Sequence, residues 1–207
     1  MIQPDLEGAI NFASRLLDEK LPAELYYHSA AHTQVEVLWA AERLAALEAL
    51  DDQSFMLLKT AVYFHDVGYT EQREQHEEIS RRIAAQVLPG FGYLPSQVQA
   101  IESMILATRL PQSPQTLAEM ILADADLSTL GRDTFLVRSA DLRAERQAYG
   151  EKFTTLEWYL VQLDFLARHH YFTPAAKNLF NTQKQVNMDT LQNLIDELRR
   201  SAGSVKP

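Results

Sequence analysis

Side chains that can bind a metal ion are grouped at four places in this chain of 207 residues, which contains no cysteine. The four places are His28 with His32, His65 with Asp66, His76 with Glu77, and Asp124 with Asp126. Because cysteine is absent, only imidazole and carboxylate groups are available as strong ligands. A single histidine on a helix is more often exposed or hydrogen-bonded than metal-binding. Metal chemistry therefore requires several of these places to act together.

Two of the places put charge directly after apolar sequence. His65 and Asp66 follow Ala61-Val62-Tyr63-Phe64, and Asp124 and Asp126 lie at the end of a second apolar run. A buried charge needs a cation or hydrogen bonds as partner, so a metal would satisfy both places, whereas core hydrogen bonds are the alternative. Two positions along a helix rotate a side chain by about 200°, so only one of the two aspartates can face an ion.

The elements that must position these groups are predicted to be helices. The chain has only seven glycines, Ala, Leu, Glu, Gln and Arg dominate its long segments, and alternating Val/Ile/Thr runs are missing. We therefore predict an all-α fold, with helices over residues 5–19, 29–49, 53–66, 76–88, 96–108, 115–130, 133–149, 154–172 and 174–200.

Helix 53–66 is apolar on most sides and is expected to be central, with Gly68 in the left-handed conformation that closes a helix. The expected organisation is a single domain over residues 1–200 and a disordered tail over 201–207. The long polar helix 174–200 either packs across the body or extends to a partner, such as a second copy in a homodimer.

Composition excludes several classes of function. Nineteen Lys and Arg against 28 Asp and Glu give a net charge of −9, and no basic cluster exceeds a pair, which disfavours nucleic-acid binding. No apolar stretch approaches the roughly 20 residues of a membrane span, so no membrane association is expected. The amino terminus lacks the pattern of a secretory signal, and a cytoplasmic location is the resulting expectation.

Three motifs together resemble the H…HD…D signature of HD-domain metal-dependent phosphohydrolases. They are Tyr27-His28-Ser29-Ala30-Ala31-His32, Phe64-His65-Asp66 and Ala125-Asp126-Leu127. Their order and separations match, and His76-Glu77-Glu78-Ile79-Ser80 and Ile105-Leu106-Ala107-Thr108 are secondary matches to the small bacterial single-domain members. The resemblance covers a motif core of residues 26–172 and implies a compact multi-helix bundle with a long C-terminal helix.

The resemblance implies that His32, His65, Asp66 and Asp126 are the metal ligands, with Asp126 preferred over Asp124 because of the Ala-Asp-Leu match. Two imidazoles and two carboxylates suit one divalent ion, and Mn, Fe, Co, Ni, Zn and Mg all remain open.

Catalytic roles are likewise implied by the resemblance. His28 occupies the place of the histidine that protonates the leaving oxygen in the related cyclic nucleotide phosphodiesterases, although Ser29 stands where asparagine is usual. Local hydrogen bonding near a helix start is the alternative for His28. Asp66 or Asp126 is expected to help orient the attacking water. His76 and Glu77 could bind substrate, activate water or hold a second ion, or they could simply be a polar helix start.

Binuclear relatives add two histidines between the HD pair and the last aspartate, whereas this chain offers only His76 and has Ala107-Thr108-Arg109 at the second place. A mononuclear site is therefore expected. Arg109 and Arg143 are predicted to contact phosphate, with a solvated face as the alternative. His169 lies near a helix end, where positive charge is favourable, and needs no ligand role.

The function predicted from these residues is a metal-dependent phosphohydrolase, an enzyme that hydrolyses a phosphate ester or nucleotide with metal-activated water. Its expected partner is a small phosphorylated substrate, and a nucleotide is the first candidate. The alternative is a non-catalytic helical protein that binds a nucleotide or alarmone through a degenerate HD site. A purely structural role for the motif residues ranks last.

Overall fold

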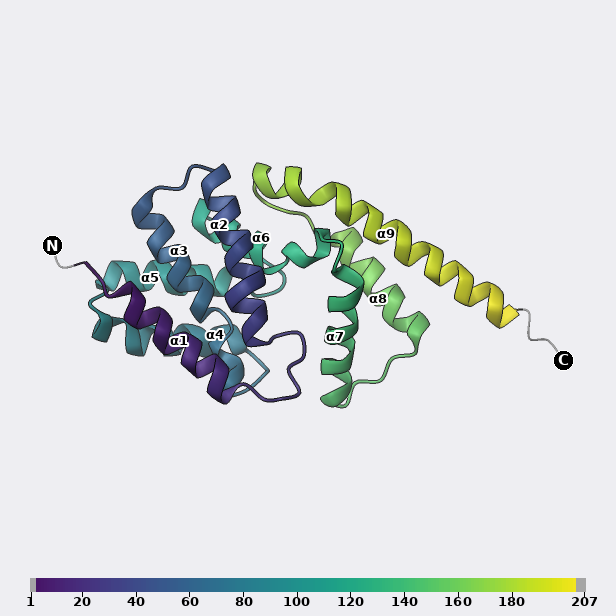
Figure 1. The fold of residues 1–207 in the computed structure, drawn as a ribbon, viewed down its shortest axis with the longest axis horizontal. Coiled ribbons are helices and arrows are strands. Elements are labelled where there is room, and N and C mark those ends of the chain that lie inside the picture. Colours follow the sequence, from purple (N-terminus) through teal and green to yellow (C-terminus); the bar gives the residue numbers. More distant parts are fainter. Residues whose placement is uncertain (1–2, 204–207) are drawn as a thin grey trace.

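The computed structural model describes residues 3–203, and every regular element in that range is helical (Figure 1). The α-helices are α1 (Leu6–Lys20), α2 (Leu38–Leu47), α3 (Asp52–Phe64), α4 (His76–Val87), α5 (Pro95–Ala107), α6 (Leu117–Asp126), α7 (Phe135–Ala148), α8 (Thr155–Arg168) and α9 (Pro174–Gly203). A π-helical segment, η1 (His32–Val37), precedes α2, and short 3-10 segments are η2 (Val67–Thr70), η3 (Leu88–Phe91) and η4 (Ser128–Gly131). The predicted all-α class is confirmed. None of the described helices is long and apolar enough to cross a bilayer.

Capping boxes fix where two of the helices begin. Thr116 accepts a hydrogen bond from the backbone N–H of Glu119 at the start of α6, and the Glu119 side chain accepts from the backbone N–H of Thr116 in return. Thr154 and Glu157 form the same reciprocal pair at the start of α8. These bonds satisfy amide groups that the first helical turn leaves without a partner, and the Thr-x-x-Glu pattern is visible in the sequence.

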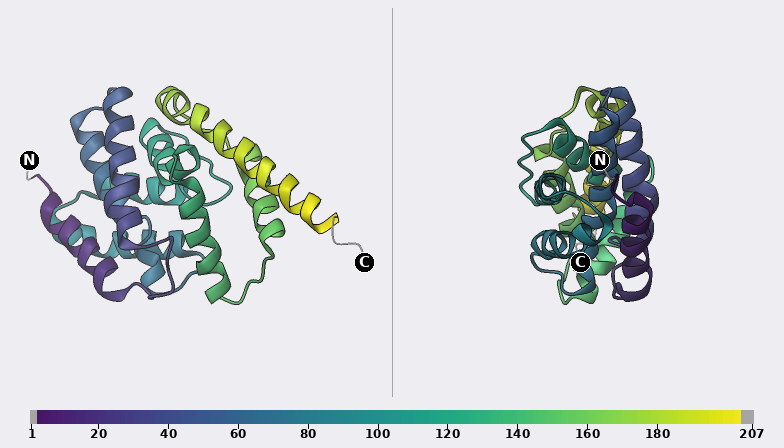
Figure 2. Two further views of the ribbon diagram at one scale, coloured as in Figure 1. Left: turned by 45° about the vertical axis from the view of Figure 1, so that its right-hand side comes forward. Right: turned by 90° about the vertical axis from the view of Figure 1, so that its left-hand side faces the viewer.

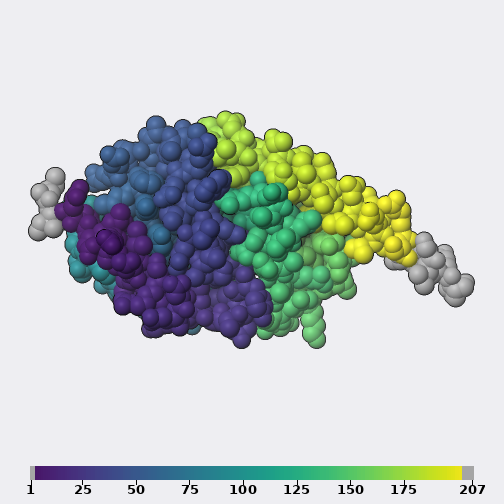
Figure 3. Space-filling model, in the orientation of Figure 1, coloured from purple at the N-terminus to yellow at the C-terminus, as the bar shows by residue number. Residues whose placement is uncertain are grey.

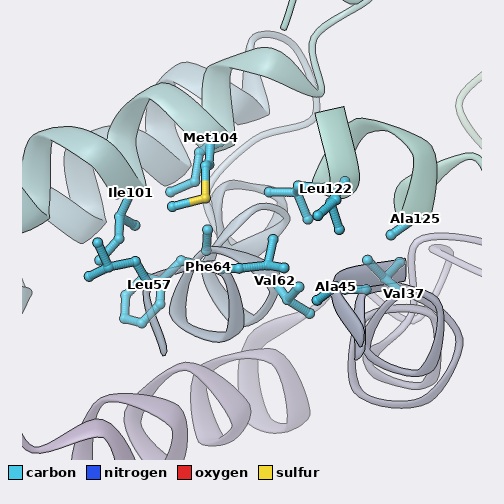
Figure 4. Close-up of a cluster of buried hydrophobic side chains, with 14 of the residues drawn as sticks. Val37, Ala45, Leu57, Val62, Phe64, Ile101, Met104, Leu122 and Ala125 are labelled. Atoms are coloured by element: carbon cyan, nitrogen blue, oxygen red, sulfur yellow. The ribbon is translucent and has the colours of Figure 1, made fainter. Parts of the chain in front are cut away.

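Helix α3 lies at the centre of the main hydrophobic core, as predicted. It packs against α1, α2, α5 and α6, and both Val62 and Phe64 are fully buried. Figure 4 shows these two side chains among residues of the neighbouring helices, including Ile101, Met104 and Leu122. The core therefore fixes the C-terminal end of α3, which is where His65 and Asp66 follow.

The C-terminal part of the chain builds a second, smaller cluster. Its buried members are Leu130, Phe135, Leu166 and Leu191, contributed by η4, α7, α8 and α9. Helix α9 packs along α8 and η4, and the side chain of Asn187 donates to the carbonyl oxygen of Leu130 at 2.9 Å. The left view of Figure 2 shows α9 beside α8, and in Figure 3 it lies toward the narrow right-hand end of the surface. The last helix therefore packs on its own chain.

Several element boundaries differ from the sequence prediction. The helix predicted over 29–49 contains the π-helical turn, the one over 115–130 breaks after Asp126, and the one over 154–172 ends at Arg168. The last difference arises because the buried Asp124 carboxylate accepts hydrogen bonds from the backbone N–H groups of Phe172 and Thr173. Helix α9 extends to Gly203, and residues 204–207 of the predicted tail lie outside the described part of the chain.

Gly68 does not adopt the left-handed conformation predicted for it. Its role is a close approach of two chain segments, because a Cβ added at Gly68 would lie 2.0 Å from the carbonyl oxygen of His76. The N–H of Gly68 also donates to the Ser80 hydroxyl at 2.8 Å. Glycine therefore lets the start of α4 come close to the end of α3.

Candidate metal centre

His65 and Asp66 follow α3 directly and are both buried. The Nδ1 atom of His65 lies 2.7 Å from the carbonyl oxygen of Val62. Because a carbonyl oxygen only accepts, Nδ1 carries a proton and Nε2 is the atom left to bind a cation. Nε2 of His65 and Oδ2 of Asp66 lie 3.3 Å apart, and both are buried without a hydrogen-bond partner among the described residues. Such a facing pair requires a positive partner.

The π-helical segment η1 delivers His32 to the same place. Nδ1 of His32 lies 3.2 Å from Oε2 of Glu36, and Nε2 lies 3.9 Å from Oδ2 of Asp66. Glu36 is held in turn by Arg138, whose Nε lies 3.0 Å from Oε1 of Glu36. A carboxylate on the far nitrogen is the arrangement that fixes the ring of a metal-binding histidine. Single π-turns within helices are frequent at functional sites.

Asp126, the last residue of α6, brings a fourth group. Its Oδ1 atom lies 3.2 Å from Nε2 of His32 and 3.6 Å from Nε2 of His65. One potential ligand atom from each of His32, His65 and Asp66 lies within 4.8 Å of the others. The structure thus brings together all four ligands predicted from the sequence, and their nitrogen and oxygen atoms fit a divalent cation.

The electrostatics of this cluster also favour a cation. Burial alone would lower the pKa of His32, but hydrogen bonds to Asp126 and Glu36 raise it to about 9. Burial alone would raise the pKa of Asp66, but the charge of His65 holds it well below its usual range. The carboxylates therefore demand positive charge between them, which either imidazole protons or a bound cation supplies.

Asp124, the rival candidate from the sequence, faces away from this cluster. Its carboxylate accepts from the N–H groups of Phe172 and Thr173 at 2.8 Å each and from the Thr173 hydroxyl at 2.7 Å. These bonds hold the segment that leads into α9. As expected from the helical rotation, only one of the two aspartates reaches the site.

His28 lies beside the metal ligands, but on an irregular segment rather than on the same helix as His32. Its Nδ1 atom is 2.6 Å from Oε1 of Glu145, and the backbone N–H groups of Tyr27 and His28 both donate to Oε2 of Glu145 at 3.0 Å. Burial alone would raise the pKa of Glu145, but the bond from His28 lowers it, so the carboxylate is ionised. No role was predicted for Glu145 from the sequence, and this contact was missed. The burial of Glu145, which is only 1% exposed, becomes visible only in the structure.

His76 and Glu77 also lie at the site. Nε2 of His76 is 3.5 Å from Oδ1 of Asp66, and Nδ1 is 3.5 Å from Oε2 of Glu77. The His76 ring stacks on Tyr69 with ring centroids 3.9 Å apart. The roles predicted for the pair, in substrate binding, water activation or holding a second ion, remain predictions.

The two arginines predicted to contact phosphate are placed elsewhere. Arg109 is exposed, Arg143 donates to the carbonyl oxygen of Phe153 at 2.7 Å, and neither lines the cavity described below. Arg146 is the arginine that lines it. One helical turn separates Arg143 from Arg146, so the periodicity of the sequence could not distinguish them.

A cavity of about 330 Å³ opens at the group of candidate metal ligands. At the cluster it is lined by His28, Asp66, Tyr69, His76, Glu77 and Asp126. It continues between α7 and α8, which belong to the C-terminal part of the molecule in Figure 1. The chain thus places a candidate cation site at one end of a cavity large enough for a small ligand.

Comparison with known proteins agrees with this geometry. Residues 31–129 match the HD domain. The fold is similar to that of a predicted HD superfamily hydrolase from an uncultured Thermotogales bacterium, with a TM-score of 0.63 and 19% identity over 94% of both chains. It is also similar to a protein from Lactobacillus plantarum, with a TM-score of 0.68 and 18% identity over 99% of this chain and 100% of that one. A search of curated proteins finds no match.

The chain thus carries a match to the HD domain over residues 31–129, and the two histidines and two aspartates that converge in the structure all lie within this stretch.

Proposed function

We propose that this protein is a metal-dependent phosphohydrolase that hydrolyses a phosphate ester. The observation that carries the proposal is the convergence of the buried His32, His65 and Asp66 with the half-buried Asp126 at one end of an open cavity. The HD domain and the predicted hydrolase among its structural neighbours support the same class of reaction. A nucleotide is one substrate within this proposal.

The four ligands would hold one divalent ion through Nε2 of each histidine and one oxygen of each aspartate. When bound, such an ion supplies Lewis acidity toward a phosphoryl oxygen and lowers the pKa of water toward about 7. The hydrogen bond from Nδ1 of His65 to Val62 and the contact between Nδ1 of His32 and Glu36 leave Nε2 of each ring as the atom that would bind the ion.

His28 supplies the proton that the leaving group needs. Glu145 engages Nδ1, and the ring lines the cavity, which leaves Nε2 as the donor atom. Water forms the new P–O bond as the ester P–O bond breaks, and the departing alkoxide takes the Nε2 proton to leave as an alcohol. The proton that the attacking water gives up leaves with the phosphate product or through solvent, from which His28 is protonated again. Asp66 orients the water, with Oδ1 positioned near His76 and Oδ2 near His65.

Phosphate release after chelation and reloading with individual divalent metals tests this function. His28→Gln should retain metal content and lose at least about 100-fold in kcat, in line with the usual contribution of general acid catalysis. The control is His170→Gln, which changes an exposed histidine outside the cavity. Ligand binding with no turnover of any phosphate ester would instead support the alternative of a nucleotide-binding or alarmone-binding protein.

A further inference from the structure

The cavity beside the candidate metal ligands has a second end, which is mostly apolar. Residues of η4, α7 and α8 line it, and most of them are apolar: Leu130, Phe135, Leu142, Val161 and Phe165. This end lies beyond residue 129, where the match to the HD domain stops. The family match therefore does not describe this end, and its chemistry follows from the residues that line it.

Gln162 is a largely buried polar group in this apolar end. Its residue is only 5% exposed, it lines the cavity, and its side-chain amide has no hydrogen-bond partner among the described residues. The neighbouring Ser139, by contrast, accepts a hydrogen bond from Nε1 of Trp158 at 2.9 Å. The amide is not among the fully enclosed side-chain atoms that lack a partner, so it is open to the cavity, where a ligand group can form hydrogen bonds with it. The geometry thus points to a ligand group at Gln162.

The charges around the cavity limit what that ligand can be. Arg146 is the only Lys or Arg among the described residues that line it. Nε of Arg146 lies 3.0 Å from both carboxylate oxygens of Glu151, and the guanidinium lies 4.8 Å from the ring centre of Phe153. Asp66, Glu77 and Asp126 add negative charge. A chain of two or three phosphates would find little positive charge here beyond that of a metal ion.

We propose that the substrate is the monophosphate ester of a compact, uncharged, mainly apolar alcohol, and that Gln162 selects it by hydrogen bonding to a polar edge of that alcohol. This inference rests on the proposed phosphohydrolase function. The phosphate would lie at the candidate metal ligands, and the alcohol would extend between α7 and α8. Diphosphate and triphosphate compounds would be excluded by the lack of unpaired cations.

Matched synthetic esters test the proposal. 4-Carbamoylbenzyl phosphate and 4-isopropylbenzyl phosphate have nearly the same shape, but only the first offers an amide to Gln162. The metal-loaded protein should hydrolyse the carbamoyl ester with kcat/KM at least about tenfold higher, the effect of about one buried hydrogen bond. The corresponding carbamoylbenzyl diphosphate should be hydrolysed at least about tenfold more slowly than the monophosphate.

Gln162→Leu should abolish the preference by lowering kcat/KM for the carbamoyl ester while leaving that for the isopropyl ester within about threefold. The matched control is Gln185→Leu, which changes an exposed glutamine of α9 and should retain the preference. Equal losses on both esters would show a merely structural role for Gln162 and overturn the proposal. A parent protein with no preference, or with equal rates on the monophosphate and diphosphate, would also overturn it.

Failure of the phosphohydrolase function gives a different result. In that case neither ester is turned over, and calorimetry with the matched non-hydrolysable benzylphosphonates replaces the assay. A preference for the carbamoyl phosphonate that Gln162→Leu removes would support selection by Gln162, and equal affinities would refute it.

Discussion

Replacing Asp124 with alanine should destabilise the protein without removing its metal. The carboxylate accepts two backbone N–H bonds of 2.8 Å and one hydroxyl bond of 2.7 Å, all from residues that lead into α9. Hydrogen bonds to a charged group contribute about 1.5–3 kcal/mol each. Burial raises the pKa of Asp124, so desolvation offsets part of this gain. Counting the two amide bonds at the lower value gives a loss of about 3 kcal/mol.

For a chain of this length, that loss corresponds to a fall in Tm of about 6–12 °C. Asp126→Ala is the matched comparison, because it removes a carboxylate two positions away on the same helix. It should abolish metal binding and change the Tm of the metal-free protein by less than about 4 °C, since its hydrogen bonds are to histidines rather than to backbone. Differential scanning fluorimetry with metal analysis measures both effects. Loss of metal from folded Asp124→Ala, or full metal content in Asp126→Ala, would show that the two roles are reversed.

Three further perturbations test other parts of the structure. Glu145→Gln should retain metal but lower kcat about tenfold or more, because the glutamine cannot hold His28 with an ionised carboxylate; unchanged kcat would remove Glu145 from the mechanism. Gly68→Ala should lower Tm and reduce activity, because its Cβ would lie 2.0 Å from the carbonyl oxygen of His76, and a Tm equal to that of the parent would contradict this close approach. Burial, with Lys184 nearby, lowers the pKa of His169 to about 3. Below pH 6.5 the unfolded chain therefore binds a proton that the folded protein excludes, so stability falls as pH decreases, by about 2 kcal/mol at pH 5. Urea denaturation at pH 7 and pH 5 should show this fall diminished in His169→Phe, and equal falls in both proteins would refute it.

The features that could be predicted from the sequence are those that leave a regular pattern of residues in it. Apolar spacing located the helices, and the core-type residues before His65 indicated that the pair after them had to be buried. The H…HD…D resemblance selected Asp126 over Asp124, and the structure then showed why Asp124 is buried without a cation: it binds the segment before α9. That contact joins residues 48 and 49 positions apart, beyond the reach of helical periodicity.

Contacts across the cavity were not predictable in the same way. Glu145 and Gln162 lie on helices outside the recognised motifs. The contact of Glu145 with His28 and the place of Gln162 in the cavity lining depend on how α7 and α8 pack against the rest of the chain. The sequence does not distinguish a glycine that permits close packing from one that ends a helix in the left-handed conformation, so the prediction for Gly68 was wrong. His169 was predicted to be a favourable positive charge at a helix end, whereas its ring packs at 4.6 Å from that of Tyr171 and both of its ring nitrogens are buried.

The metal content of the protein tests the central claim most directly. Elemental mass spectrometry should be applied to protein purified without nickel affinity chromatography, beside the double variant His65→Ala/Asp66→Ala and with circular dichroism to verify folding. The four convergent ligands predict about one equivalent of a divalent metal in the parent and none in the folded variant. Absence of metal from both proteins, even after reloading with each candidate ion, would contradict the assignment of a metal centre.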